Sequence, residues 1–120
     1  MIQSYKDLEV WKKSVSLTIE IYKLTFKIPK EELYGLTLQI RRAMVSIPSN
    51  IAEGRSRGHR NEFIQFLKIA YGSGAELETQ LIIAKEIGYI TERDYLSITE
   101  KLSEVMRMLN GLISKLKPKT

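Results

Sequence analysis

The sequence contains no cysteine, a single histidine and only two aspartates, and these shortages exclude several kinds of chemistry. Without cysteine there is no disulfide, thiolate nucleophile or thiolate metal ligand, and such a composition suits a reducing compartment. His59 is the only imidazole, and Asp7 and Asp94 lie at expected helix starts, so few residues are available for a Ser-His-Asp arrangement. The carboxylate metal sites of helix bundles need Glu-x-x-His pairs, and no glutamate lies three residues before His59. We therefore expect no enzyme activity, metal or cofactor.

Long apolar runs are also missing. No stretch reaches the roughly 18 apolar residues that a membrane span needs, and the first residues show no basic head followed by an apolar run. We therefore expect a cytoplasmic protein without a membrane partner.

No glycine-rich phosphate loop is visible in the sequence. Gly72 and Gly74 fall in the middle of an expected helix and are not followed by a lysine–serine pair. Glycine inside a helix costs about 1 kcal/mol relative to alanine. The two glycines therefore predict close packing against a neighbouring helix.

The apolar pattern predicts one all-helical domain. A chain of 120 residues with 43% hydrophobic content can bury one core and is too short for two ordinary domains. Prolines and glycines divide it into four segments, each with apolar residues at helical spacing. Short connections favour antiparallel neighbours. The sequence thus predicts an all-α, antiparallel up-down four-helix bundle over residues 1–120, with Trp11, Ile40, Phe66 and Leu109 in a common core. The predicted helices lie near residues 5–27, 31–56, 60–87 and 92–116.

Two helix starts carry capping signals. Ser4 is followed three residues later by Asp7, and Thr91 by Asp94. In each pair the hydroxyl can accept a hydrogen bond from a free N–H group, and the carboxylate places negative charge at the positive end of the helix.

Pro48 lies inside the apolar pattern of the second helix. It removes the hydrogen bond to the carbonyl of Met44 and should kink the helix there. Asn50 and Glu53 follow closely, and we interpret them as structural residues that satisfy backbone groups freed by the kink.

The first helix is apolar on two sides. We assign to the core the stripe made of Leu8, Trp11, Val15, Ile19, Tyr22 and Phe26. Almost opposite lies a second stripe, made of Val10, Leu17, Ile21, Leu24 and Ile28. A four-helix bundle cannot bury both faces of one helix, so the second stripe is predicted to contact another subunit. The alternative is that these are scattered exposed apolar residues, which are common on protein surfaces.

Basic charge is concentrated in one segment. Residues 41–60 hold five arginines and one glutamate, a local excess of four charges out of the whole chain's five. Arginine suits bidentate contact with phosphate, and the third helix begins beside this segment with free N–H groups. The candidate nucleic-acid-binding residues are Arg41, Arg42, Arg55, Arg57, Arg60 and Lys68. The alternatives are an ordinary solvated surface, or salt bridges to another helix or subunit.

Several motifs resemble a known family, the 23S rRNA intervening-sequence proteins, also called the four helix bundle protein family. The motifs are residues 7–12 (DLEVWK), 34–37 (YGLT), 39–43 (QIRRA), 46–54 (SIPSNIAEG), 63–67 (FIQFL), 72–79 (GSGAELET) and 88–90 (GYI). The resemblance covers roughly residues 5 to 116. It implies a small bacterial four-helix protein that assembles as a ring-like pentamer. The family is also similar to the accessory variability determinant of diversity-generating retroelements, a basic pentamer that binds nucleic acid and a reverse transcriptase.

Two functional hypotheses follow. The first is a homo-oligomer that binds the backbone of RNA or DNA, with the assembly multiplying a weak basic patch. The second is a protein-interaction scaffold whose arginines form salt bridges or subunit contacts. Binding that weakens steeply with salt would distinguish the first from the second.

Overall fold

A computed structural model describes residues 4–118 as four long helices and two short 3-10 turns, with no strand among these residues. The predicted all-α four-helix fold is therefore confirmed. The elements are η1 (Tyr5–Asp7), α1 (Glu9–Thr25), η2 (Lys30–Glu32), α2 (Leu36–Ser56), α3 (Arg60–Ile87) and α4 (Glu92–Leu116).

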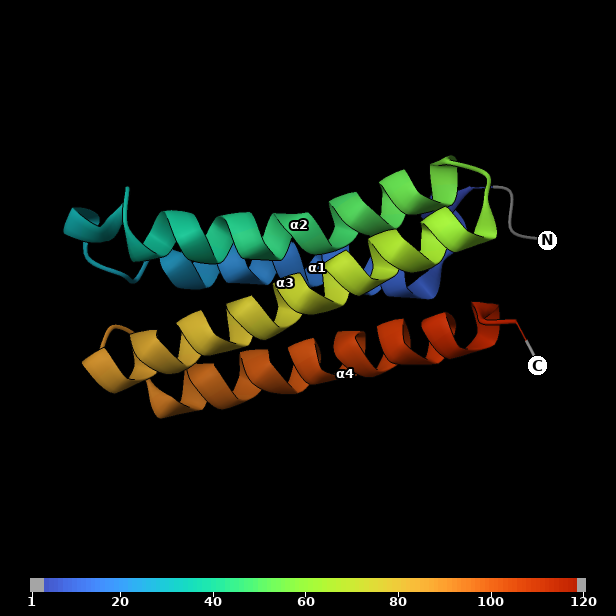
Figure 1. The fold of residues 1–120 in the computed structure, drawn as a ribbon. Coiled ribbons are helices and arrows are strands. Elements are labelled where there is room, and N and C mark those ends of the chain that lie inside the picture. The colour runs from blue at the N-terminus through green and yellow to red at the C-terminus, as the bar shows by residue number, and fades with distance from the viewer. Residues whose placement is uncertain (1–3, 119–120) are drawn as a thin grey trace.

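The helices form an elongated molecule with extents of 47 × 23 × 21 Å. The α1–α2 and α3–α4 connections lie at one end of Figure 1, and the α2–α3 connection lies at the other end with the start of α1 and the end of α4. The chain thus reverses direction at each connection. α1 packs against α2 and α4, and α3 packs against the same two helices.

Helix starts follow the capping signals in part. The Thr91 hydroxyl accepts a hydrogen bond from the Asp94 N–H at 3.0 Å and caps α4, as predicted. The Ser4 and Asp7 capping box also forms, but it caps η1, because the chain turns extended at Leu8 before α1 begins. α2 begins at Leu36, five residues later than predicted. Residues 30–32 form the separate turn η2 instead.

α2 continues through Pro48, which is buried. Asn50 donates hydrogen bonds from its side-chain amide to the Ser46 carbonyl at 2.7 Å and to the Ser46 hydroxyl at 2.8 Å, and that hydroxyl lies 2.8 Å from the Ser73 hydroxyl of α3. The amide therefore bonds the Ser46 carbonyl, whereas the carbonyl whose helical hydrogen bond Pro48 removes is that of Met44. The same amide supports a polar contact between α2 and α3. The kink at Pro48 stays a prediction.

Two glycines allow close helix packing. A Cβ on Gly54 of α2 would lie 2.5 Å from Cβ of Phe66 on α3, and a Cβ on Gly74 of α3 would overlap Sδ of Met106 on α4. The packing prediction is thus confirmed for Gly74. It is wrong for Gly72, which is exposed and has no neighbour in reach of an added Cβ.

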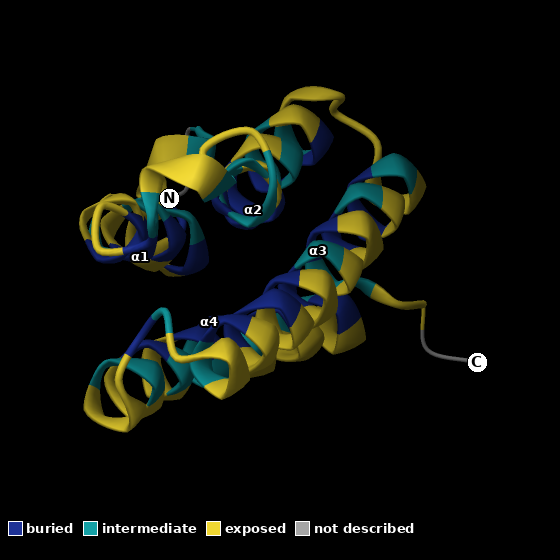
Figure 2. Cartoon of the chain, turned by 90° about the vertical axis from the view of Figure 1, so that its left-hand side faces the viewer, coloured by how far each residue is buried: buried dark blue, intermediate teal, exposed yellow. Residues whose placement is uncertain are grey.

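The core lies between the four helices, where the buried faces meet in Figure 2. Ile40 and Leu109 are fully buried in it, whereas Trp11 and Phe66 are half-buried. Trp11 packs against the edge of the core. Of the four residues predicted to share a common core, two therefore lie at its centre and two at its periphery.

The two faces of α1 are exchanged relative to the prediction. The stripe assigned to a subunit contact is the one buried inside the chain: Val10, Leu17, Ile21, Leu24 and Ile28 are all at most 6% exposed. Of the stripe assigned to the core, Leu8 is buried as predicted, but Ile19 and Phe26 are 55% and 77% exposed. A buried stripe cannot meet another subunit while the bundle is intact, so the interface assignment to these five residues is wrong.

The reason for the exchange lies beside the buried stripe. Ser14 and Thr25 are fully or almost fully buried, and their hydroxyls donate to the carbonyls of Trp11 and Tyr22 in α1 itself, each at 2.9 Å. Small, internally satisfied side chains leave room for the neighbouring helix, whereas the aromatic stripe is bulky. The aliphatic side of α1 therefore faces the core.

Candidate nucleic-acid interface

The α2–α3 connection forms one end of the molecule, and it carries two of the candidate arginines in one place. Arg55, in the last turn of α2, and Arg60, the first residue of α3, line a surface hollow of about 240 Å³ together with His59. Phe63 and Leu116 form part of its apolar wall. Two guanidinium groups and an imidazole therefore border the same opening.

α3 starts at this hollow without a side-chain cap. Its N-cap is His59, whose side chain accepts no capping hydrogen bond, and the first bonded N–H of the helix is that of Phe63, which donates to the His59 carbonyl at 3.0 Å. The N–H groups at the start of a helix carry partial positive charge. An anion at this end would therefore meet N–H donors and arginines together.

Two lysines at this end were not among the residues predicted from the sequence. Lys115 and Lys117 flank Leu116, which lines the hollow from the end of α4. The two lysines were visible in the sequence as basic residues at the end of the fourth helix. Their position near the hollow could not be predicted, because only the folded bundle brings the end of α4 beside the start of α3.

Arg57 lies nearby but is occupied by acidic partners. Its guanidinium donates to Glu53 at 2.9 Å, lies 3.5 Å from a Glu62 carboxylate oxygen, and sits 5.1 Å above the Phe66 ring. The hydrogen bond to Glu53 raises the pKa of Arg57 above its ordinary value. Two carboxylates thus compensate this charge, so Arg57 is poorly suited to bind a phosphate.

Arg41 belongs to a different region. Its Nε donates to the Thr25 hydroxyl at 2.9 Å, and its guanidinium lies 4.6 Å from the centre of the Tyr22 ring and 5.1 Å from that of Phe26. These contacts join α2 to the exposed stripe of α1. Arg41 also lies 14 residues before Arg55 on the same helix, about 21 Å along its axis at 1.5 Å per residue.

Arg42 and Lys68 are exposed, and neither forms an ion pair with another residue in the range 4–118. Arg42 shares the early turns of α2 with Arg41, far from the hollow. Lys68 lies eight residues into α3, about 12 Å from its start. The six candidates therefore do not form one patch: the fold gathers Arg55, Arg57 and Arg60 and leaves the other three apart.

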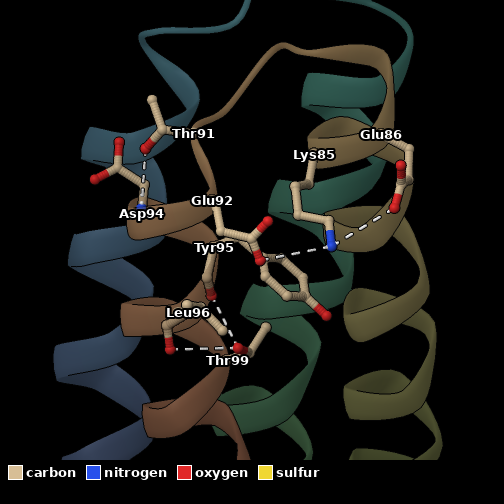
Figure 3. Close-up of polar contacts among 8 residues, drawn as sticks. All are labelled: Lys85, Glu86, Thr91, Glu92, Asp94, Tyr95, Leu96 and Thr99. Atoms are coloured by element: carbon tan, nitrogen blue, oxygen red, sulfur yellow. Dashed lines mark hydrogen bonds and ion pairs between the residues drawn. The ribbon is translucent and has the colours of Figure 1, made fainter.

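The opposite end of the molecule contains a mixed-charge network (Figure 3). Lys85 of α3 lies 4.5 Å from the centre of the Tyr95 ring of α4 and within 4.0 Å of carboxylates of Glu86 and Glu92. Lys27 of α1 pairs with Asp94 at 2.7 Å. The ion pairs at this end connect neighbouring helices. Because acidic and basic side chains alternate here, this end has no basic surface comparable to that at the α2–α3 connection.

Metal clusters and membrane-spanning helices are both missing from the described part of the chain. Within residues 4–118, no group of three or more histidine, aspartate or glutamate side chains is placed to hold a metal ion. None of the helices formed by these residues combines the length and apolarity needed to cross a membrane.

Comparison with known proteins identifies the family. The family model of the 23S rRNA-intervening sequence protein matches residues 6–111. A solved structure from Bacteroides thetaiotaomicron VPI-5482, described as a protein with unknown function from the S23 ribosomal protein family, is similar with a TM-score of 0.78 and 30% identity, over 87% of this chain and 97% of that chain. No curated protein matches the chain. The chain therefore belongs to the 23S rRNA-intervening sequence protein family.

Proposed function

We propose that this protein is a non-enzymatic homo-oligomer that binds the phosphate backbone of RNA or DNA through the end formed by the α2–α3 connection. The observation that carries the proposal is the hollow bordered by Arg55, Arg60 and His59 at the uncapped start of α3. A phosphate there would accept hydrogen bonds from guanidinium forks and lie at the positive end of the helix dipole.

The chemistry of this end favours backbone contact over reading of bases. The surface is a helix end with short loops, and contacts to phosphate position a protein without carrying sequence information. One subunit supplies few such contacts, so a single copy should bind weakly. Several copies in one assembly would raise the effective concentration of each further site.

The exposed stripe of α1 supports the oligomeric part of the proposal. Although the two faces are exchanged, α1 still carries a second apolar side that its own bundle does not bury. Ile19, Tyr22 and Phe26 belong to this side. The five-copy ring that the resemblance implies is the expected size of the assembly.

The proposal is tested by measuring binding to unrelated RNA and DNA oligonucleotides over a range of salt concentrations. The variant Arg55→Ala/Arg60→Ala should lower affinity by a similar factor for all sequences. It should also flatten the dependence of log affinity on log salt, by about one unit of slope for each phosphate that the protein no longer neutralises.

A matched control removes the same charge elsewhere. Lys23→Ala/Lys30→Ala changes two exposed lysines far from the hollow that form no ion pair within the described part of the chain. It should leave the salt dependence close to that of the parent. Equal effects of the two variants, or a parent that binds no nucleic acid at low salt, would contradict the proposal.

A protein-interaction scaffold is the second candidate function. It is favoured by the exposed aromatic and aliphatic side chains of α1, since contiguous apolar surface marks protein contacts. In the scaffold, Arg55 and Arg60 would form salt bridges or subunit contacts, so a parent that assembles but binds no nucleic acid would support it.

A further inference from the structure

Two exposed apolar faces lie on different helices of this chain. The first, called here the α1–α2 face, consists of Ile19, Tyr22 and Phe26 of α1 with Arg41 and Val45 of α2. Ile19, Tyr22 and Phe26 repeat at helical spacing, and Val45 lies one turn after Arg41 on the same side of α2.

The second face, called here the α3 face, runs along α3. Ile69, Glu76, Ile83 and Ile87 follow at intervals of seven, seven and four residues, which places them on one side of the helix. The three isoleucines are between 44% and 56% exposed. Ser73, which contacts Ser46 of α2, lies one turn from Ile69 and borders this face, whereas Gly74 faces Met106 of α4 on another side of the helix.

Each face carries one charge within its apolar surface, and the two charges are of opposite sign. Arg41 is held by the Thr25 hydroxyl and two aromatic rings, and no ion pair to it forms among residues 4–118. Glu76 lies between Ile69 and Ile83 and likewise has no ion pair in the described chain. Two apolar faces with complementary central charges satisfy the requirements of a contact with each other.

We infer that the α1–α2 face of one copy docks on the α3 face of a second copy. Arg41 of the first copy then forms an ion pair with Glu76 of the second. The inference rests on the homo-oligomeric part of the proposed function and identifies its contact. Because the two faces differ, each docked pair keeps one face of each kind available, so further copies add in the same way. Such head-to-tail contacts generate closed rings or open filaments, whereas a contact between identical faces stops at two copies.

The decisive experiment blocks one face at a time, in solutions without nucleic acid. Ile19→Lys/Phe26→Lys blocks the α1–α2 face, and Ile69→Lys/Ile83→Lys blocks the α3 face. Sedimentation should give each variant alone the mass of one 13.9 kDa chain. Mixed in equal amounts, the two should form a species of twice that mass, because each retains the face that the other lacks.

The control is Ile82→Lys/Leu96→Lys, which places lysines at two exposed apolar positions outside both faces. It should assemble like the parent. Circular dichroism checks that all variants remain helical.

A second measurement avoids disruptive substitutions. Since the chain has no cysteine, Ile19→Cys and Ile83→Cys introduce unique thiols. A bismaleimide with a flexible spacer should link the two variants to each other in a mixture and link neither efficiently to itself.

The inference is overturned if the parent is monomeric at tens of micromolar, if a blocked variant still assembles alone, or if the thiol variants cross-link only with themselves. These outcomes are independent of nucleic-acid binding, so failure here and failure of the backbone-binding proposal can be told apart.

Discussion

At the scale of single residues, the same side chain has different roles according to its neighbours. Arg57 is compensated by Glu53 and Glu62, and Arg41 lies against two aromatic rings. Arg55 and Arg60 border an open hollow. Sequence composition shows five arginines close together in the chain, but only the fold shows which of them border the hollow.

The ion pair between Lys27 and Asp94 predicts a dependence of stability on pH. The hydrogen bond from Lys27 lowers the pKa of Asp94, so folding favours the charged carboxylate. This contribution is present above the ordinary aspartate pKa of about 4 and is lost as pH falls through the lower folded value. Asp94→Asn should therefore lower the urea midpoint at pH 7, and the difference from the parent should shrink in acid.

Asparagine keeps the backbone N–H that Thr91 caps, so the comparison isolates the carboxylate. Glu78→Gln, at an exposed position without an ion pair in the described chain, should show no such change with pH. A gap between the parent and Asp94→Asn that persists unchanged in acid would contradict the assignment.

At the scale of helices, glycine marks close packing at some positions and has no such role at others. Gly54→Ala would place a Cβ against Cβ of Phe66, an atom that can move only with the α3 backbone. Such overpacking costs about 1–3 kcal/mol, more than the roughly 1 kcal/mol that alanine gains over glycine in a helix. The variant should lower the free energy of unfolding measured in urea at fixed protein concentration.

Gly111→Ala provides the matched comparison. Gly111 also lies inside a helix, but apart from its own helix backbone an added Cβ would meet nothing within 4 Å. It should therefore raise the free energy of unfolding by about 0.5–1 kcal/mol. The packing argument is refuted if both alanines shift stability in the same direction.

At the scale of the whole molecule, the inferred contact between the two exposed faces predicts that assembly depends on the charge of Glu76. Glu76→Arg would place positive charge opposite Arg41 across the inferred contact and should weaken the assembly in sedimentation, most strongly at low salt. Adding Arg41→Glu should restore part of it. Glu78→Arg makes the same charge change two residues away, on another side of α3, and should have little effect. Equal weakening by both single variants would argue against the pairing.

The sequence alone determined the number of helices, their approximate extents and most of the core of three of them. Residues such as Ile40, Leu67, Leu81 and Leu109 follow one helical stripe in each segment, and all four are fully buried. The stripes assigned to the core in these segments are the ones that the bundle buries. The sequence also showed that basic charge gathers near the α2–α3 connection, because the residues that break the helices there can be recognised in the sequence.

Only the tertiary structure decided which side of α1 is the core. Both of its stripes have the helical period, so periodicity could not choose between Ile19 and Ile21. The choice depended on how closely neighbouring helices could approach, which the small buried side chains of Ser14 and Thr25 permit on the aliphatic side. The fold likewise placed Thr25 of α1 beside Arg41 of α2 and brought Leu116 of α4 to the hollow beside Arg60. These relations join residues far apart in sequence, and local pattern carries no information about such distances.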